Sequence, residues 1–478
     1  MPSGIVIGAI WSFIQRFGGL AIGFVSNMVL ARLLCPEDFG TMGMVMVFVS
    51  MADVLVDGGL GNALIQKKDL SKDDISTVFS SNLTLSIFLF TLCFIAAPAI
   101  ESYTKIANLS LFLRVESVLI LIRAFYIIPA SLLSKNLQFR VIAKINLMVA
   151  FLSVCVSISM AYAGAGVWSL LCRNIVSDLL LTIAYFIISK APVEIGFKMA
   201  IFKKLFGFGF FVVLSNLIES AYANIINFFI GKKYDVKELG YYSQAYALQQ
   251  IPVYSMTSVL NQVLFPYFSK IQDDTSQLQS KLKISIQTTT FCVFPLMAFL
   301  MTYAGQVIEI LYSEKWMPCV PYFQLFCISG CFNALIHINR SLLKSQGYTR
   351  MIFILQLLNA IIGTSLLIWA LKYDIIMAVI TYIINTIILF VATTYFAGLK
   401  INYSILQQLK DISPNLIITL ICIILTYLCM KHIKLSLFFN ILFEFLMFAS
   451  LYIFFHAIIK TQTWETMRKL LKPISRTL

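Results

Sequence analysis

LARLLCPEDFG at residues 30–40 and DGGLGNALIQ at residues 57–66 bracket an apolar segment about as long as a bilayer is thick. Another apolar segment runs up to this stretch from Phe13. Pro36 ends the first segment as a helix, and the carboxylate of Asp38 is expected to cap the helix that follows. The stretch therefore predicts a transmembrane helical hairpin closed by a tight turn.

The hairpin recurs farther along the chain. At an offset of 200 residues, Gly40 aligns with Gly240, and Asp73–Asp74 aligns with Asp273–Asp274. A constant offset that holds through glycines and polar turns indicates an internal duplication, which is typical of transporters. The repeat predicts an N-terminal lobe of six helices, a C-terminal lobe of six helices, and a pair of further helices with a basic tail, at residues 1–200, 201–400 and 401–478.

The composition is that of an integral membrane protein. The 478 residues are 59% hydrophobic and 12% charged, with a mean hydropathy of +0.87, whereas soluble domains carry roughly 25% charged residues. Apolar runs of about 20 residues recur along the chain, and they predict an all-α fold with about fourteen transmembrane helices. The runs lie at residues 5–30, 41–60, 76–98, 109–134, 143–163, 167–189, 206–230, 240–268, 285–311, 320–343, 351–372, 376–397, 413–431 and 436–459.

The net charge of +14 is explained by membrane topology rather than by nucleic-acid binding. Lysines and arginines gather in alternate loops and in the C-terminal tail, and the positive-inside rule places these loops and both termini in the cytoplasm. No predicted loop is longer than about twenty residues, which leaves no room for a soluble catalytic domain. The sequence thus predicts a multi-pass protein whose work is done within the membrane.

Neither a metal site nor a cofactor is expected. The ten cysteines lie mostly within the apolar runs, and no CxxC pair or histidine cluster accompanies them. The first apolar run is not expected to be a cleaved signal, because Arg16 interrupts it and no basic segment precedes it.

Arginines inside the predicted spans are candidate ligands for an anion. A guanidinium within hydrocarbon costs several kcal/mol unless it faces water or a partner, so Arg16, Arg123 and Arg173 are predicted to face a cavity. For Arg16 the alternative is a side chain that reaches the cytoplasmic interface. For Arg173 the alternative is a structural ion pair, either with Asp178 or across neighbouring helices.

The start of the second lobe is the most polar part of the predicted membrane region. Four side chains follow helical spacing on one stripe, and two adjacent glutamines come from the next helix. Amides suit sugar hydroxyls because each amide donates and accepts hydrogen bonds, but the same groups could bond one helix to another. The predicted substrate-binding residues of the central cavity are Arg16, Asn27, Arg123, Arg173, Asn216, Ser220, Asn224, Asn227, Gln249 and Gln250.

Carboxylates in the same spans are candidate ion-coupling or gating groups. Asp53 and Asp57 lie four residues apart, on one face of the second helix. They could bind a proton or a cation, or pair with a basic residue as an inner gate, whereas Asp57 could simply end the helix. Asp178 and Glu219 complete the predicted coupling set. Glu116, by contrast, is expected to reach the membrane interface.

Three motifs in a fixed order carry a family resemblance: LARLLCPEDFG at 30–40, DGGLGNALIQ at 57–66 and LYSEKW at 311–316. With these motifs the sequence resembles the bacterial polysaccharide-exporter flippases of the O-antigen and colanic-acid type. That family belongs to the multidrug/oligosaccharidyl-lipid/polysaccharide (MOP) exporter superfamily, which also holds the lipid II flippase and the MATE drug exporters. The resemblance implies two pseudo-symmetric six-helix lobes around a central cavity, with two extra C-terminal helices.

The resemblance also implies a function. It implies alternating-access movement of an undecaprenyl-diphosphate-linked oligosaccharide (an O-antigen, capsule or exopolysaccharide repeat unit) across the bacterial cytoplasmic membrane, coupled to H⁺ or Na⁺. The implied partners are this lipid-linked sugar, membrane lipids and polysaccharide polymerase machinery, with a monomer as the working unit. Arginines in the first lobe of relatives meet the diphosphate, and Arg16 is the best match here. The lipid II flippase has more arginines in its first hairpin, so that arrangement does not carry over.

Two other classes of function stay open from the sequence. A MATE-like multidrug or cation antiporter would favour an acidic or aromatic cavity, and the internal arginines argue against it. A membrane glycosyltransferase using the same lipid donor would carry an acidic pair in its first outer loop, which Glu37–Asp38 resembles. The second repeat has Lys237–Glu238 at this place, so helix capping explains the acidic pair better. Moving a lipid across a membrane changes no covalent bond, so neither catalytic residues nor an enzyme activity are predicted.

Overall fold

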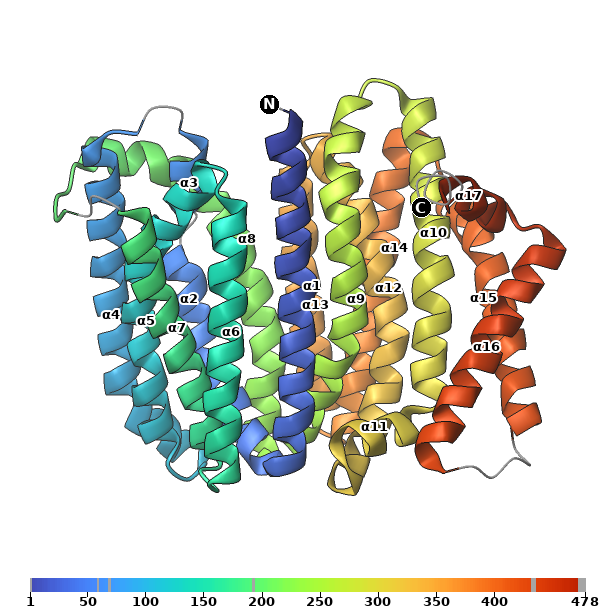
Figure 1. Ribbon diagram of the computed structural model, residues 1–478, viewed down its shortest axis with the longest axis horizontal. Helices are drawn as coiled ribbons and strands as arrows, with labels where there is room; N and C mark the ends of the chain where they lie inside the picture. Colours follow the sequence, from blue (N-terminus) through green and yellow to red (C-terminus); the bar gives the residue numbers. More distant parts are fainter. Residues whose placement is uncertain (1, 58–59, 68–69, 191–193, 431–435, 472–478) are drawn as a thin grey trace. The chain divides into compact units, whose positions relative to one another are not determined.

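The computed structural model describes the backbone of residues 2–57, 60–67, 70–190, 194–430 and 436–471. In these ranges the chain forms seventeen α-helices, one short 3₁₀-helix and no β-strand (Figure 1). The all-α membrane fold predicted from the sequence is therefore confirmed. The side chain of Asp57, one of the predicted coupling groups, lies outside the described part of the chain.

The chain divides into two compact units, Met1–Ser243 and Gln244–Leu478. Unit 1 holds α1 (Pro2–Leu33), α2 (Pro36–Asp57), α3 (Leu60–Gln66), α4 (Lys72–Thr104), α5 (Leu109–Lys135), α6 (Phe139–Tyr162), α7 (Val167–Ser189), α8 (Met199–Lys233) and the first turns of α9 (Val236–Lys270). Unit 2 holds the rest of α9, then α10 (Thr275–Thr302), α11 (Ala304–Tyr312), the 3₁₀-helix η1 (Glu314–Cys319), α12 (Val320–Ser345), α13 (Thr349–Ala370), α14 (Ile375–Ile401), α15 (Ile405–Met430), α16 (Leu437–Ile459) and α17 (Gln462–Leu471). The lobe boundaries expected at residues 200 and 400 stay a prediction.

Eleven helices among the described residues are long and apolar enough to cross a membrane. The other three predicted spans coincide with α5, α8 and α9, which are 27, 35 and 35 residues long. The span expected at 285–311 differs from the structure, because α10 begins earlier and a separate helix, α11, follows it. Asp274 explains the early start, since its carboxylate accepts hydrogen bonds from the backbone N–H groups of Ser276 and Gln277 at 3.0 and 2.9 Å.

The turn between α1 and α2 has the geometry that its sequence predicts. Pro36 is the first residue of α2, where its missing N–H costs no helical hydrogen bond. The Asp38 carboxylate accepts a hydrogen bond from the backbone N–H of Cys35 at 2.9 Å, so it caps the start of the helix. The Glu37 carboxylate lies 3.6 Å from the Nζ of Lys237, its counterpart in the second repeat. Both acidic residues of this turn therefore have structural partners.

The two copies of the hairpin turn touch each other within unit 1. A Cβ atom added at Gly40 would overlap the backbone carbonyl oxygen of Val236, and one added at Gly240 would overlap that of Pro36. Gly40 and Gly240 are equivalent in the repeat, and so are Pro36 and Val236. The first turns of α2 and α9 thus cross at a reciprocal contact where only glycine leaves room for the opposite backbone.

The DGGLGNALIQ motif contributes α3, a helix of seven residues. Its Leu60 and Leu64 join a buried apolar cluster with Ile128 of α5. At the last residue of α5, the Nζ of Lys135 donates hydrogen bonds to the backbone carbonyl oxygens of Leu64 and Lys67. A lysine at this place satisfies carbonyl groups that have no partner inside the short helix.

A fully buried carboxylate fixes the start of α4. Asp74 accepts a hydrogen bond from the backbone N–H of Ser71 at 2.9 Å, and the Ser71 hydroxyl accepts one from the backbone N–H of Asp74 at 3.2 Å. This reciprocal arrangement is a capping box. The same carboxylate lies 2.5 Å from the Nζ of Lys67, so the cap also holds the segment before α4.

Replacing Asp74 by alanine is expected to lower the free energy of unfolding by about 2 kcal/mol, at the upper end of the cost of a lost helix cap. Thermal unfolding of the purified protein measures the change. Asp73→Ala is the matched control, because the Asp73 side chain is 54% exposed and its ion pair with Lys198 lies at the surface, where such a pair contributes at most about 1 kcal/mol. Equal losses for the two variants would contradict the structural role given to Asp74.

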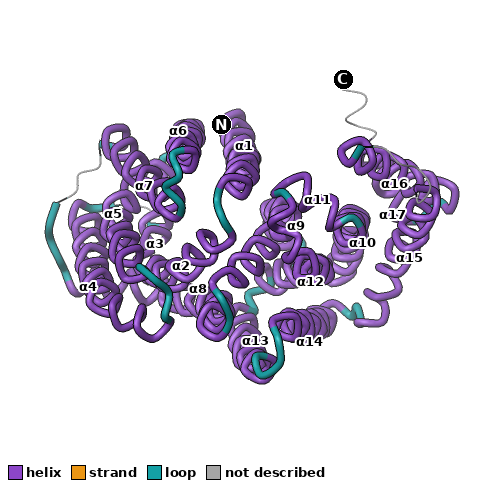
Figure 2. Tube along the Cα trace, turned by 90° about the horizontal axis from the view of Figure 1, so that it is seen from below, coloured by secondary structure: helices purple, strands orange, loops and turns teal. Residues whose placement is uncertain are grey.

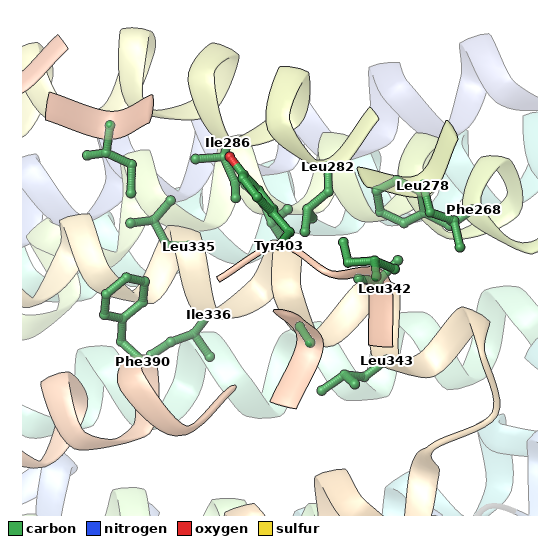
Figure 3. Close-up of a cluster of buried hydrophobic side chains, with 14 of the residues drawn as sticks. Phe268, Leu278, Leu282, Ile286, Leu335, Ile336, Leu342, Leu343, Phe390 and Tyr403 are labelled. Atoms are coloured by element: carbon green, nitrogen blue, oxygen red, sulfur yellow. The ribbon is translucent and has the colours of Figure 1, made fainter. Parts of the chain in front are cut away.

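Each unit has its own packed interior. In unit 1, α5 packs against α2, α4 and α7, which the view along the helices also shows (Figure 2). In unit 2, α12 packs against α10 and α14. Leu282 and Ile286 of α10 and Leu335 and Leu342 of α12 meet there in an apolar cluster (Figure 3). Side chains of α5 can therefore reach three neighbouring helices at once.

Candidate ion-coupling and substrate site

One arginine lies between two aspartates inside unit 1. Arg123 of α5 donates a hydrogen bond through Nε to Oδ2 of Asp178 on α7 at 2.6 Å, and another through Nη1 to Oδ2 of Asp53 on α2. The three side chains line a cavity of about 320 Å³. We call these residues the Arg123 cluster. Three helices thus bring their charges to one point, because α5 packs against both α2 and α7.

The Arg123 cluster holds more negative than positive charge. The side chains of Arg123, Asp53 and Asp178 are only 19%, 22% and 10% exposed. The second carboxylate oxygen of Asp53, Oδ1, has no hydrogen-bond partner among the described residues. One guanidinium neutralises only one of the two carboxylates, and an uncompensated buried carboxylate is costly. The arrangement therefore favours a bound proton or a small cation.

A second set of charged groups lies between α5 and α7. Glu116 of α5 is fully buried and accepts a hydrogen bond from Nδ2 of Asn174 on α7 at 2.7 Å. Glu116 also interacts electrostatically with Arg173 and with Asp178. The expectation that Glu116 reaches the membrane interface is therefore wrong. A signal was present in the sequence, because Glu116 and Arg123 are seven residues, or about two helical turns, apart and share one face.

Arg173 and Asp178 do not pair with each other. Asp178 pairs with Arg123, whereas Arg173 interacts only electrostatically with Glu116, so both interactions run between α7 and α5. Five residues along an α-helix turn through about 140°, which points the two side chains in different directions. Among the described residues Arg173 forms no ion pair with Asp178, and its electrostatic interaction with Glu116 runs to the neighbouring helix.

The polar stripe of α8 lies against α2 at one position. Nδ2 of Asn224 donates hydrogen bonds to Oγ of Ser50 and to the backbone oxygen of Ser220, both at 2.8 Å. For Asn224 the structure thus contains helix-to-helix bonding, the alternative to a cavity-lining role. Of the other two asparagines in the stripe, Asn216 is exposed and Asn227 is half-buried.

The remaining predicted site residues do not line the cavity of the Arg123 cluster. Arg16 and Asn27 are half-buried on α1, and Glu219 is exposed on α8. In unit 2, Gln249 is fully buried with neither end of its amide hydrogen-bonded to a described residue, and Gln250 is half-buried. The structure therefore brings together the charged residues predicted on three helices of unit 1 and leaves the amides elsewhere.

Long helices with a charge cluster held between them define a multi-pass membrane protein with the architecture of a transporter. Sequence comparison gives its family: residues 29–321 match the family model described as "Polysaccharide biosynthesis protein". The chain belongs to that family.

Two curated bacterial proteins and one solved structure show how far the similarity extends. The lipopolysaccharide biosynthesis protein WzxC of Escherichia coli (strain K12) is 25% identical over 353 residues, which cover 72% of this chain and 70% of WzxC. The succinoglycan biosynthesis transport protein ExoT of Rhizobium meliloti (strain 1021) is 26% identical over 324 residues, 67% of this chain and 65% of ExoT. The lipid II flippase MurJ, in an inward closed conformation, aligns with a TM-score of 0.75 at 18% identity, over 95% of this chain and 98% of that chain. The fold is therefore the MOP fold that the sequence predicts.

Proposed function

We propose that the chain is a flippase that moves a polyprenyl-diphosphate-linked oligosaccharide across a bacterial cytoplasmic membrane by alternating access. The names of its relatives support a transport role in polysaccharide biosynthesis, since WzxC is a lipopolysaccharide biosynthesis protein and ExoT is a transport protein for succinoglycan biosynthesis. Translocation makes and breaks no covalent bond, so the protein needs no nucleophile and acts as a transporter rather than an enzyme.

The Arg123 cluster is the observation that carries the coupling step of the proposal. Its excess negative charge provides a site for H⁺ or Na⁺ between helices that contact one another. When the ion is bound, the cluster is neutral. When the ion leaves, Asp53 and Asp178 compete for one guanidinium, so the packing of α2 and α7 on α5 becomes less favourable. The ion therefore binds the closely packed arrangement of α2, α5 and α7 more tightly than an arrangement in which they have moved apart. The ion gradient then biases the equilibrium between these two arrangements.

Arg16 is the proposed contact for the diphosphate. A guanidinium can hold a phosphate through two parallel hydrogen bonds, and it keeps its charge when partly buried. Arg16 is half-buried on α1, in the first predicted span. The amides of Asn27, Asn227 and Gln250 are proposed to bond sugar hydroxyls, while the polyprenyl chain stays in the lipid.

The proposed orientation follows from the lysine-rich loops. Under the positive-inside rule these loops and both termini face the cytoplasm. The substrate then enters from the cytoplasmic leaflet, where its diphosphate meets basic loops. We propose a monomer as the working unit, supplying repeat units to polysaccharide polymerase machinery on the outer face.

Asp53→Asn is expected to reduce export of the lipid-linked oligosaccharide about tenfold or more, the range of ordinary coupling free energies. The amide keeps a hydrogen bond to Arg123 but removes the excess negative charge that binds the ion. The measurement is the amount of lipid-linked oligosaccharide retained on the cytoplasmic face of a deletion strain that carries each variant at equal protein level. Asp73→Asn, an exposed aspartate at the start of α4, is the matched control.

Arg16→Ala tests headgroup recognition separately. We expect this variant to fail at every imposed ion gradient, whereas Asp53→Asn should lose the dependence of export on the gradient. Two results would contradict the proposed function. If the deletion strain never forms the lipid-linked intermediate, the protein acts upstream as an enzyme. If the intermediate forms and crosses the membrane normally, the protein exports something else.

A further inference from the structure

A polar pocket lies at one end of unit 2, where three segments meet. It has a volume of about 740 Å³ and lies between the first turns of α10, the loop and first turns of α15, and the junction of α16 with α17. Residues that line it include Ser280, Lys283, Tyr403, Lys410, Asp411 and Ile459. We call it the α10–α15 pocket. None of these residues takes part in the Arg123 cluster or in the proposed path of the sugar.

The one carboxylate named in this lining is already occupied by donors from its own unit. Asp411 has a 15% exposed side chain, and its Oδ1 lies 2.9 Å from the Nζ of Lys283. Its Oδ2 accepts a hydrogen bond from the Tyr403 hydroxyl at 2.5 Å, and Nε2 of Gln287 donates to Oδ1 at 3.4 Å. Lys283 and Asp411 therefore form a neutral pair, and Asp411 offers little attraction to a further cation.

Lys410 leaves the pocket with a net positive charge. It is exposed, and it forms no ion pair within the described ranges. Lys283 uses one of the three N–H groups of its ammonium on Asp411 and keeps the others for a ligand. Ser280 adds an exposed hydroxyl from α10. Two ammonium groups and a hydroxyl around one space are suited to the oxygen atoms of a phosphate.

Apolar groups also line the pocket. Ile459 and Pro414 line it, and the ring of Tyr403 lies alongside Leu282 and Ile286 in the core of unit 2 (Figure 3). Burial, together with the hydrogen bond to the Asp411 carboxylate, raises the pKa of the Tyr403 phenol, so it remains a donor at neutral pH. Cationic and apolar groups around one space fit an amphiphile better than a fully hydrated solute.

The helix beside the pocket has the character of a helix that lies on a membrane surface. The α17 segment QTWETMRKLL combines an interfacial tryptophan, Trp464, with an exposed arginine, Arg468. Its start is fixed to α16, because the Thr461 hydroxyl lies 2.8 Å from Nδ1 of the buried His456 and accepts a hydrogen bond from the backbone N–H of Trp464 at 3.2 Å. This junction fixes the start of α17 beside the pocket, which Thr461 itself lines.

We propose that the α10–α15 pocket binds the phosphate of an anionic membrane lipid, with Lys410 and Lys283 on the phosphate oxygens and the acyl chains along Pro414 and Ile459. Basic pockets between transmembrane helices are known to hold anionic headgroups in this way. The lipid links α17 to α10 and α15, so its binding stabilises unit 2. Lipid binding at this site does not depend on transport, so this proposal can be wrong while the proposed flippase activity is right, and the reverse.

Binding is measured on the purified full chain in detergent, from the rise in unfolding temperature with added lipid. We expect phosphatidylglycerol to stabilise the wild type more than phosphatidylcholine with the same acyl chains. Lys410→Gln should weaken the apparent affinity for phosphatidylglycerol about fivefold, the contribution of one lysine near a lipid surface. Lys344→Gln is the matched control, because Lys344 is an exposed lysine of α12 that does not line the pocket.

A gain of affinity provides the second test. Ser280→Lys adds a positive charge to the pocket at an exposed position, and it should tighten phosphatidylglycerol binding about fivefold. Inorganic phosphate at the same concentration separates the two sources of the ligand. If phosphate alone stabilises the wild type as much as the lipid does, the site binds free phosphate, and the proposal that its ligand is a lipid is wrong. Equal effects of Lys410→Gln and Lys344→Gln, or equal binding of phosphatidylglycerol and phosphatidylcholine, would contradict the proposed anionic-lipid site.

Discussion

Arg123→Ala is expected to lower the free energy of unfolding by about 3–5 kcal/mol, the usual cost of removing one partner from a buried ion pair. The substitution leaves Asp53 and Asp178 facing each other across a cavity without a guanidinium between them. Two buried carboxylates in that position cannot both stay ionised, and neither has another arginine within the cluster. Thermal unfolding of the purified protein, and its level in the membrane, measure the loss.

Two further variants make the Arg123 test specific. Arg114→Ala removes an arginine of the same helix that is hydrogen-bonded to the backbone oxygen of Phe94 and stacked on its ring, and it should cost far less. Adding Asp53→Asn and Asp178→Asn to Arg123→Ala should restore much of the lost stability, because no buried charge is then left unpaired. If Arg123→Ala is no more harmful than Arg114→Ala, the Arg123 cluster does not hold α2, α5 and α7 together.

The second large effect is expected at the crossing of the two hairpin turns. Gly40→Val and Gly240→Val should each destabilise the protein by about 3 kcal/mol or more, at the upper end of the cost of overpacking. At both positions the new Cβ would meet a backbone carbonyl oxygen, that of Val236 or of Pro36. A backbone atom at the start of a helix cannot move aside as the tip of a flexible side chain can.

Gly19→Val is the control for the glycine substitutions. Gly19 also lies in a membrane-spanning helix, but apart from the backbone of its own helix no heavy atom lies within 4 Å of a Cβ added there. We therefore expect Gly19→Val to leave the unfolding temperature nearly unchanged. Wild-type stability in either of the other two variants would mean that the turns of α2 and α9 do not touch in the folded protein.

The helices could be predicted because each one depends mainly on its own residues. Apolar runs of bilayer length, Pro36 and the capping side chain of Asp38 are all local signals, and the structure agrees with them. The early start of α10 is also local, since Asp274 caps it, but apolar runs do not mark a helix that extends into water. Hydropathy therefore finds where a helix crosses the membrane better than where it begins.

The Arg123 cluster could be predicted only in part. A lone arginine or aspartate in an apolar span requires a partner, and this argument singled out Arg123, Asp53 and Asp178. It does not say which partner, because the paired residues are 70 and 55 positions apart and meet only when α2, α5 and α7 pack. The interfacial position expected for Glu116 is wrong for the same reason, since its partner Asn174 is 58 residues away.

Neutral amides are harder to assign from sequence than charged groups. Asn224 follows the spacing expected of a cavity wall, yet it bonds to Ser50 on the neighbouring helix. An amide satisfies its hydrogen bonds equally well with a sugar or with another helix, so spacing alone does not separate the two roles. The substrate-binding roles of Asn27, Asn227 and Gln250 stay predictions that export assays can test.

The reciprocal contact of the hairpin turns bears on how the chain arose. Gly40 meets the residue equivalent to Pro36, and Gly240 meets Pro36 itself, so one pair of complementary surfaces is used twice. Two identical half-length chains would form the same pair of contacts around a two-fold axis, as an isologous dimer does. The contact therefore fits a gene fusion of a symmetric dimer, and it ties the two copies together, because a larger residue at either glycine would meet the backbone of the other copy.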